Sequence, residues 1–274
     1  MDMHMLGVMY APSDQITLMA MLNYHVNDMQ MLMKMPMSGG MGGMGGMGGM
    51  GGMTSMSSMM NSPMIMEMES EGLGDVKLGA LQSLYSDDHS RFHANWIVSL
   101  PTGSIDQEID SANPMTDGKR LAYGMQLGSG SFDFEPALTY VQQYSAFSWG
   151  AQAKAIFRLN ENKHDYRLGD KYQAQAWFQV PFLQRFSASL RLAWQDIGEV
   201  RGQDDEIESL SMKNPLANGD NFGGSLTSAG FGVNAVLPAG NRLAIEYVTV
   251  LDQDSNGIQM TMEDYASFGW QFAF

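Results

Sequence analysis

The chain has 274 residues, of which only 16% are charged, and it contains no cysteine. Ordinary soluble domains contain about 25% charged residues, so this composition is unusual for a soluble enzyme. The absence of cysteine excludes both a disulfide framework and a thiolate metal site. The formal net charge is −15 and the basic residues are scattered, which argues against a nucleic-acid partner, because phosphate binding needs clustered Lys and Arg side chains.

Hydropathy restricts how this chain would cross a membrane. The sequence has no apolar run of about 18 residues, which excludes a transmembrane helix. Only a β-barrel pairs all its backbone groups without such a helix, so a barrel is the one structure that would span a membrane here. The chain does not start with a basic segment followed by an apolar one. We therefore expect that any secretory signal lies upstream of Met1 or has been removed.

Strict alternation of apolar and polar residues predicts β-strands, because the two faces of a strand meet different surroundings. Residues 147–159 show it well, with Phe147 and Trp149 on one face and Gln152 and Lys154 on the other. In chain order, the predicted strands are 3–10, a second strand that contains 18–22, then 92–100, 132–140, 147–159, 172–180, 186–194, 227–237, 243–251 and 264–274.

Short and long connections alternate between these strands. The short ones are residues 11–14, 86–90, 143–145, 181–185 and 238–241, and the long ones are 36–71, 101–129, 160–168, 196–223 and 252–263. This is the pattern of periplasmic turns and extracellular loops in outer-membrane barrels. A soluble β-sandwich also alternates, but its strands have about 5–6 residues, whereas a tilted membrane strand needs about 9–11, which fits the segments here better.

These patterns predict an all-β chain that forms one antiparallel transmembrane β-barrel over residues 1–274, in the outer membrane of a Gram-negative bacterium. If Phe274 ends in the periplasm, every long connection lies outside the cell and the strand 3–10 starts on the outer side. Together with the segment that the connections 36–71 and 86–90 leave between them, about eleven strands are visible. Bacterial barrels have an even number, so we expect a twelfth strand upstream of Met1. Residues 36–71 are expected to be a Met- and Gly-rich low-complexity loop on the extracellular side.

Several short motifs at predicted strand ends and turns resemble those of a known family. They are Gly72-Leu-Gly-Asp-Val-Lys-Leu-Gly-Ala80, Ser99-Leu-Pro-Thr-Gly-Ser-Ile105, Met125-Gln-Leu-Gly-Ser-Gly130, Ser148-Trp-Gly-Ala-Gln152, Tyr166-Arg-Leu-Gly-Asp170 and Phe268-Gly-Trp-Gln-Phe-Ala-Phe274. From about Met1 to Phe274 the chain resembles the outer-membrane transporters grouped with the phenol meta-degradation pathway, in the variety with a Met-rich start. The resemblance implies a barrel inserted by the barrel-assembly machinery, which reads the last strand, and it assigns no substrate.

Methionine is concentrated at the start of the chain, where 22 of the 27 Met residues lie within the first 68 positions. In three arrays Met recurs at every second residue, so on a strand the sulfur atoms share one face. We expect Met3, Met5 and Met9 to face the lumen, with Met19 and Met21 beside them on the next strand. A patch of sulfur atoms on the lumen wall follows from this arrangement.

Thioether sulfur is a soft ligand that suits Cu(I), and the arrays are expected to meet at the extracellular mouth. The candidate copper ligands are Met1, Met3, His4, Met5, Met29, Met31, Met33, Met35, Met37, Met64, Met66 and Met68, with His4 as the best imidazole. The alternative is that these Met side chains only fill gaps in the packing. The barrel requires no cofactor, and copper is the one metal that the arrays suggest.

The acidic segments of the long loops predict a negative mouth that attracts cations. The segment Asp252-Gln-Asp-Ser-Asn-Gly257 is similar to the start of an EF-hand loop, so a calcium site is a further hypothesis. Its candidate ligands are Asp252, Asp254, Asn256 and Glu263. An EF-hand needs flanking helices, and here the predicted neighbours are strands.

No pattern in the sequence nominates a catalytic nucleophile with its base, since Gly-x-Ser-x-Gly, His-Glu-x-x-His and phosphate-loop motifs are absent. We therefore do not expect an enzyme. The leading hypothesis is an outer-membrane channel or transporter for a small solute or cation, with membrane lipid as its surroundings. The alternatives are extracellular copper capture by the Met-rich segment on a barrel anchor, and a structural surface barrel.

Overall fold

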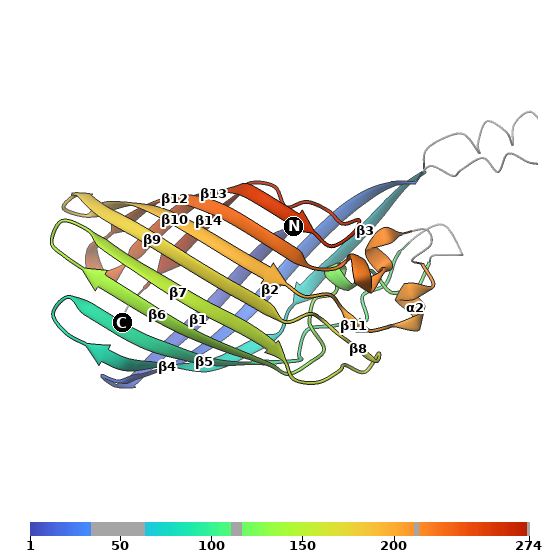
Figure 1. Cartoon of the computed structure of the whole chain (residues 1–274), viewed down its shortest axis with the longest axis horizontal. Coiled ribbons are helices and arrows are strands. Elements are labelled where there is room, and N and C mark those ends of the chain that lie inside the picture. The colour runs from blue at the N-terminus through green and yellow to red at the C-terminus, as the bar shows by residue number, and fades with distance from the viewer. Residues whose placement is uncertain (34–63, 111–116, 211–213, 273–274) are drawn as a thin grey trace, which may run out of the picture.

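The computed structural model describes residues 1–33, 64–110, 117–210 and 214–272. Almost all of its regular structure is one 12-stranded antiparallel sheet that curls into a barrel (Figure 1). The strands of the sheet are β1 (Asp2–Ser13), β2 (Ile16–Met33), β3 (Met64–Leu73), β4 (Val76–Ser86), β5 (Ser90–Leu100), β6 (Asp133–Gln143), β7 (Ser148–Arg158), β9 (Lys171–Leu183), β10 (Phe186–Ile197), β12 (Gly224–Val236), β13 (Arg242–Ser255) and β14 (Tyr265–Gln271). The predicted all-β barrel fold is confirmed.

The remaining elements lie in the connections between these strands. They are η1 (Tyr123–Met125), β8 (Tyr166–Arg167), β11 (Arg201–Gly202), α2 (Asp205–Glu208), η2 (Pro215–Ala217), η3 (Gly219–Asn221) and η4 (Pro238–Gly240). The strands β8 and β11 pair with each other in a separate two-stranded sheet. Within the described ranges, no helix has the length and apolar character needed to cross a bilayer.

Neighbouring strands follow the order β1-β2-β4-β5-β6-β7-β9-β10-β12-β13-β14, and β3 pairs with β2 off this path. The path contains eleven strands with antiparallel neighbours, so its two edge strands, β1 and β14, run in the same direction. No ladder pairing joins these two edges in the part of the chain that the structure describes. The eleven strand positions of this path agree with the about eleven strands predicted from the sequence. A further strand before Met1 stays a prediction.

The longest strand, β2, has two partners on the same side. Its first part, from Ile16 to Met21, pairs with β4, and its second part, from Tyr24 to Met33, pairs with β3. The strands β3 and β4 are therefore two halves of one strand position, broken at Gly74. The Gly74 N–H donates to the carbonyl oxygen of Asn23 (2.9 Å), and a Cβ at residue 74 would lie 2.8 Å from the ring of His25, which explains the glycine.

The prediction of a Met- and Gly-rich loop over residues 36–71 places the end of the loop too far along the chain, because residues 64–71 form most of β3. In this run Met68 and Ser70 are buried while Glu67 and Glu69 are exposed, which is the two-faced pattern of a strand. The alternation was present in the sequence but was outweighed by the low-complexity composition next to it. Residues 36–63 lie outside the described residues, so the rest of this loop stays a prediction.

Short and long connections gather at opposite ends of the barrel (Figure 1). All five predicted short turns are found at one end, which we call the turn end, and the C-terminal end of β14 lies there too. The predicted turns 11–14 and 181–185 are shorter than expected, because β1 extends to Ser13 and β9 to Leu183. The long connections 101–132, 159–170, 198–223 and 256–264 lie at the other end, which we call the loop end. The predicted alternation of connections is confirmed.

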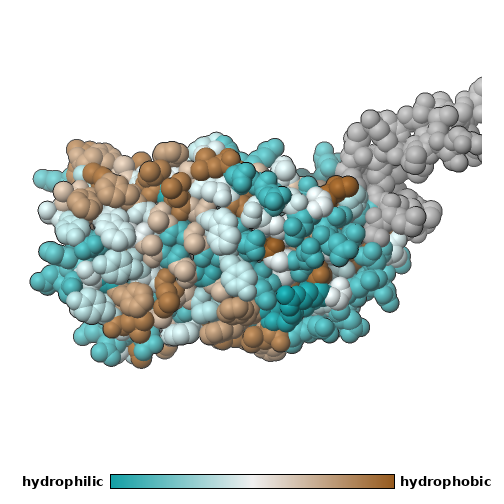
Figure 2. Space-filling model, viewed as in Figure 1, coloured by the Kyte–Doolittle hydropathy of each residue, from teal (hydrophilic) through white to brown (hydrophobic). Residues whose placement is uncertain are grey.

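The two faces of the sheet differ in polarity. The outer face is rich in apolar and aromatic side chains, and hydrophilic side chains gather at the loop end (Figure 2). Exposed side chains on the outer face include Leu78, Trp96, Leu138, Phe178, Leu192, Phe231, Ile245 and Phe268. The inner face, which we call the lumen wall, carries buried polar and charged side chains, among them Ser99, Asp133, Glu135 and Thr139.

Candidate functional site

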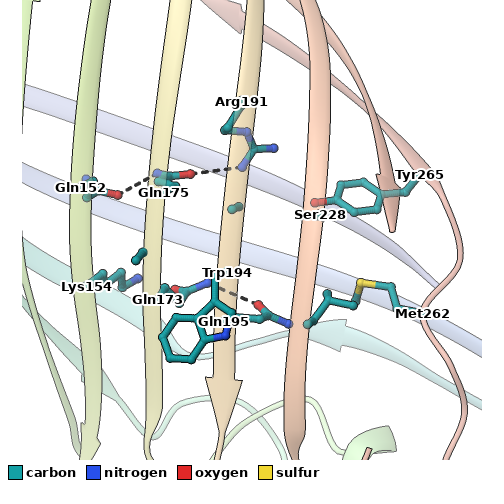
Figure 3. A pocket seen from close by; sticks show the side chains of 13 residues that line it. Gln152, Lys154, Gln173, Gln175, Arg191, Trp194, Gln195, Ser228, Met262 and Tyr265 are labelled. Atoms are coloured by element: carbon teal, nitrogen blue, oxygen red, sulfur yellow. Dashed lines mark hydrogen bonds between the residues drawn. The ribbon is translucent and has the colours of Figure 1, made fainter. Parts of the chain in front are cut away.

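A chain of hydrogen bonds runs around the lumen wall across four adjacent strands. Gln152 of β7 donates to the hydroxyl of Thr139 on β6 (2.8 Å), and Gln175 of β9 donates to the Gln152 side-chain oxygen (2.9 Å). Arg191 of β10 in turn donates to the Gln175 oxygen (3.2 Å). Figure 3 shows this row from Gln152 to Arg191. Each residue occupies the inward position of its strand, so the register of the sheet itself builds a polar belt.

The belt borders a cavity of about 150 Å³ on the inner side of β7, β9, β10 and β12. Its lining is mainly polar and includes Lys154, Gln173, Gln195, Ser228 and Tyr265. Gln173 donates to the side-chain oxygen of Gln195 (3.4 Å), which forms a second row nearer to the loop end (Figure 3). Amides and hydroxyls in such rows can exchange hydrogen bonds with a passing polar solute at little cost.

Glu135 of β6 holds two lysines from other strands on the lumen wall. Its carboxylate oxygens lie 2.6 Å from the Nζ of Lys77 on β4 and 2.6 Å from the Nζ of Lys154 on β7. The side chain of Glu135 is 1% exposed. A buried charge of this kind is retained only when it is paired, so the three residues form one electrostatic unit that ties β4 to β7 across β5.

A second ion pair lies at the loop end of the same wall. Arg158, at the end of β7, contacts the carboxylate of Asp133 on β6, and Asp133 also accepts a hydrogen bond from the hydroxyl of Ser131 (2.7 Å). The neighbouring Asp75 accepts from the backbone N–H groups of Gly103 (2.9 Å) and Ser129 (2.8 Å). These contacts anchor both ends of the 101–132 connection onto the barrel wall.

Arg191 reaches over β12 to Glu246 on β13, with its Nε 2.9 Å from Glu246 Oε1. Gly230 of β12 lies between them in the sheet, directly opposite Arg191 on one side and Val248 on the other. A Cβ at residue 230 would lie 2.5 Å from Glu246 Oε1. The absence of a side chain on Gly230 is therefore what lets this bridge form.

We expect that Gly230→Ala displaces the Glu246 carboxylate and destabilises the protein by about 1 kcal/mol, the usual size of a partly exposed ion pair. In a Glu246→Ala background the space is free, and the same substitution should stabilise the protein by about 0.5–1 kcal/mol, because glycine is costly inside a strand. Thermal unfolding of the two single variants and the double variant measures this reversal of sign. A destabilisation that persists in the Glu246→Ala background would contradict the role assigned to Gly230.

The long connections fold together at the loop end around an apolar core, and we call this unit the cap. The core is formed by buried side chains from three connections and from β2 and β3, namely Met29, Met68, Ile109, Leu121, Tyr123, Met125, Tyr166, Val200, Ile207, Leu210 and Ala217. Tyr123 and Tyr166 pack edge to face, with ring centroids 4.8 Å apart. The loop end is thus covered by packed structure, which the sequence-based prediction of a negative mouth did not include.

Arg120 and Asp204 join two of the connections in the cap. Arg120 donates from Nε and from its terminal nitrogen to the two Asp204 carboxylate oxygens, both at 2.9 Å, which is a bidentate arrangement. The same carboxylate caps α2 by accepting from the N–H of Glu206 (2.9 Å). Burial alone would raise the pKa of the Asp204 carboxyl, but the hydrogen bonds from Arg120 and from the backbone outweigh burial and hold this pKa below its ordinary value.

This lowered pKa predicts an acid-sensitive cap. Because the pKa of Asp204 is lower in the folded cap than in an unfolded one, the pair stabilises the cap fully above the ordinary aspartate pKa of about 3.9. The stabilisation is lost as the pH falls through the lower, folded-state pKa. The protection of residues 198–210, measured relative to the intrinsic exchange rate at each pH, should fall below about pH 3.9, and in Asp204→Asn it should be low already at neutral pH. Equal protection of this segment at pH 6 and at the acid limit would contradict the prediction.

The predicted orientation of the first two Met strands is confirmed. Met9 lies directly opposite Met19, which is buried while its neighbour Leu18 is exposed, so this face is the lumen wall. The same parity places the other predicted residues, Met3, Met5 and Met21, on this face. Copper binding by these residues stays a prediction.

The arrays of β2 and β3 meet in register. Met29 lies directly opposite Met68, and both side chains are buried in the apolar core of the cap. These two thioethers are used for packing, which is the alternative that the sequence left open. The remaining cross-strand partners are Met31 with Met66 and Met33 with Met64, and Met35 and Met37 lie outside the described residues.

The choice of His4 as the imidazole of this array is not supported by the geometry. His4 lies opposite Tyr24 and shares the outer face with Leu6, because residues 3 and 4 of a strand point to opposite sides. His25 is the imidazole on the Met face, directly opposite Met3. Because neighbouring residues of a strand point to opposite faces, the prediction that Met3 points inward already implied that His4 points outward.

The predicted calcium ligands do not come together. Asp252 and Asp254 belong to β13, where extended backbone separates alternate residues by about 6.6 Å, so the chain does not wrap around an ion. Asn256 donates its side-chain N–H to the Phe222 carbonyl oxygen (3.3 Å). Across the described ranges, no group of three or more His, Asp or Glu side chains, Glu263 included, is placed to hold a metal ion.

Comparisons with known proteins support the fold. No family model and no curated protein matches the sequence. Among solved structures, the fold is similar to that of an outer-membrane channel from Pseudomonas putida F1, with a TM-score of 0.58, 14% sequence identity and coverage of 97% of this chain and 79% of that chain. This similarity agrees at the level of the fold with the family resemblance of the motifs, and membership of that family stays a prediction.

Proposed function

We propose that this protein is an outer-membrane channel for small polar solutes or ions, with its extracellular mouth closed by the cap. The observation that carries the proposal is the polar lumen wall inside an apolar outer face. The belt from Thr139 to Arg191 and the unit around Glu135 provide hydrogen bonds and charges along the interior. A barrel that served only as an anchor would have no need of such a wall.

Aromatic side chains at both ends of the outer face support the membrane location. Near the turn end, Tyr140 and Trp149 lie 5.5 Å apart between ring centroids, and near the loop end Phe157 and Tyr172 lie 6.2 Å apart. Two aromatic girdles that border an apolar band are typical of barrels surrounded by outer-membrane lipid. In this orientation the turn end faces the periplasm and the cap faces outward.

The last strand supports assembly by the usual barrel-assembly machinery. Phe268, Trp270 and Phe272 are exposed and alternate along the end of the chain, while Phe274 lies outside the described residues. Such an aromatic edge strand is the part of the chain that an assembly partner can recognise. The similarity to a solved outer-membrane channel agrees with this proposal and favours a transport role over an enzymatic one.

Single-channel recording in planar bilayers tests the proposal. We expect discrete conductance steps in KCl, with long closures when the cap is intact. Protein that has been heat-unfolded before reconstitution is the control for detergent artefacts. If no conductance is seen with the intact chain or with a variant whose cap is destabilised, the channel proposal is overturned and the alternative of a structural surface barrel is favoured.

A further inference from the structure

His25 of β2 shares the lumen face with two thioethers of the neighbouring strand β1. In the β1–β2 ladder, Met3 is directly opposite His25, and Met5 is opposite Asn23, two residues along the same face. Directly opposite residues have Cβ atoms about 4.5–5.5 Å apart, and diagonal neighbours remain within reach of long side chains. Methionine has three rotatable side-chain bonds, so both sulfur atoms can approach the ring.

His25 has no hydrogen bond to any other described residue that would occupy its ring nitrogens. The ring now packs against Gly74, where a Cβ would lie 2.8 Å from His25 Nε2, and it has to turn toward β1 to meet the two sulfur atoms. Two residues along the same face, the side-chain oxygen of Asn27 is buried and accepts no hydrogen bond within the described part of the chain. An acceptor without a partner is therefore available near the imidazole.

The side chains of Met3 and Met5 are 60% and 64% exposed, whereas the cap buries Met29 and Met68. The first two thioethers therefore remain free for a ligand and the other two do not. All three candidate donors, one imidazole nitrogen and two thioether sulfurs, are neutral. Such a soft, uncharged donor set suits a monovalent soft cation much better than Mg²⁺ or Ca²⁺, which need oxygen ligands.

We propose that His25, Met3 and Met5 form a binding site for Cu(I) on the lumen wall of β1 and β2. One ring nitrogen of His25 binds the metal, and the other can donate its proton to the Asn27 oxygen. A hydrogen-bond acceptor on the ring nitrogen that does not bind the metal orients the imidazole and raises its basicity. The site does not depend on the channel being open, because its three ligands lie on adjacent strands of the sheet.

The experiment uses the full-length chain in detergent, loaded anaerobically with Cu(I) in the presence of a competing Cu(I) chelator. X-ray absorption at the copper edge distinguishes imidazole nitrogen from thioether sulfur as a ligand. This distinction matters because methionines elsewhere in the chain can bind Cu(I) through sulfur alone. The imidazole contribution therefore separates a site that contains a histidine from sites made of methionine alone, and the histidine variants identify which residue supplies it.

We expect an imidazole contribution in the unmodified protein that is lost in His25→Gln. The affinity for Cu(I) should fall by at least about tenfold in that variant and in Met3→Leu/Met5→Leu, because even the loss of a residue that only supports a ligand costs about 10–100-fold. His4→Gln, on the outer face of β1 between Met3 and Met5, is the matched control and should change neither measurement. Persistence of the imidazole signal in His25→Gln, its loss in His4→Gln, or failure of the intact protein to retain Cu(I) would each overturn the proposal.

Discussion

Replacing Arg120 with alanine is expected to open the cap. Asp204 is 2% exposed, so removal of its bidentate partner leaves a buried carboxylate with only backbone N–H groups of α2 as partners. Breaking a buried pair in this way costs about 3–5 kcal/mol, which shifts an opening equilibrium by a factor of roughly 10²–10³. Single-channel recordings of Arg120→Ala should therefore show much shorter closures than those of the unmodified protein, and added protease should cleave within residues 198–223 faster.

Lys119→Ala is the matched control for this prediction. Lys119 is the neighbouring residue, and its Nζ lies 3.9 Å from Glu206 in a largely exposed ion pair. Exposed pairs contribute about 0–1 kcal/mol, so gating and cleavage should change little. If Arg120→Ala gates like Lys119→Ala, then the cap is not held by the Arg120–Asp204 pair. Asp204→Asn keeps the shape of the side chain and should resemble Arg120→Ala in part, since it retains neutral hydrogen bonds.

The strands were predictable because each of them lies between two different surroundings. Alternation in residues such as Phe147 to Lys154 reflects an apolar outside and a polar inside, and this requirement acts on every residue of the strand. The same rule predicted that Met9 and Met19 share the lumen face, and the ladder places them directly opposite each other. It failed at β3, where alternating Met and Glu residues follow a repetitive segment and were assigned to the loop.

The cap was not predictable by the same rule. Its core residues, such as Ile109, Tyr166 and Ile207, come from three separate connections that have no regular period, so only the folded chain shows that they meet. Arg120 and Asp204 are 84 residues apart in the sequence, and nothing local marks either of them as half of a pair. The acidic segments indicated a negative mouth, whereas one of their carboxylates, that of Asp204, is buried in the cap.

The charged residues of the lumen wall were predictable in part. Parity along β6 and β7 places Glu135 and Lys154 inward, so their presence on the lumen wall was available from the sequence. Their pairing was not, because the third partner, Lys77, lies on β4, with β5 between it and Glu135. The register of four strands decides which charges meet, and this register depends on every turn that connects them.

Replacing Glu135 with glutamine is expected to shift the charge preference of the channel toward anions. The substitution keeps the shape of the side chain but removes the one negative charge that holds Lys77 and Lys154, each 2.6 Å away. Two ammonium groups then remain near each other on the lumen wall without a carboxylate between them. A unit charge about 4 Å from a permeating ion contributes up to about 4 kcal/mol at an effective dielectric constant of 20, and water in the lumen reduces this. We therefore expect a several-fold rise in the anion-to-cation permeability ratio.

Reversal potentials in asymmetric KCl measure this ratio. The matched control is Glu161→Gln, which removes the same charge from an exposed position in the 159–170 connection, where solvent and salt screen it. Loss of the pairing should also lower the thermal stability of Glu135→Gln, because like charges remain buried together. An unchanged reversal potential in Glu135→Gln, with conductance still present, would mean that permeating ions do not pass this part of the wall. A shift of equal size in Glu161→Gln would instead place the selectivity of the channel in the cap.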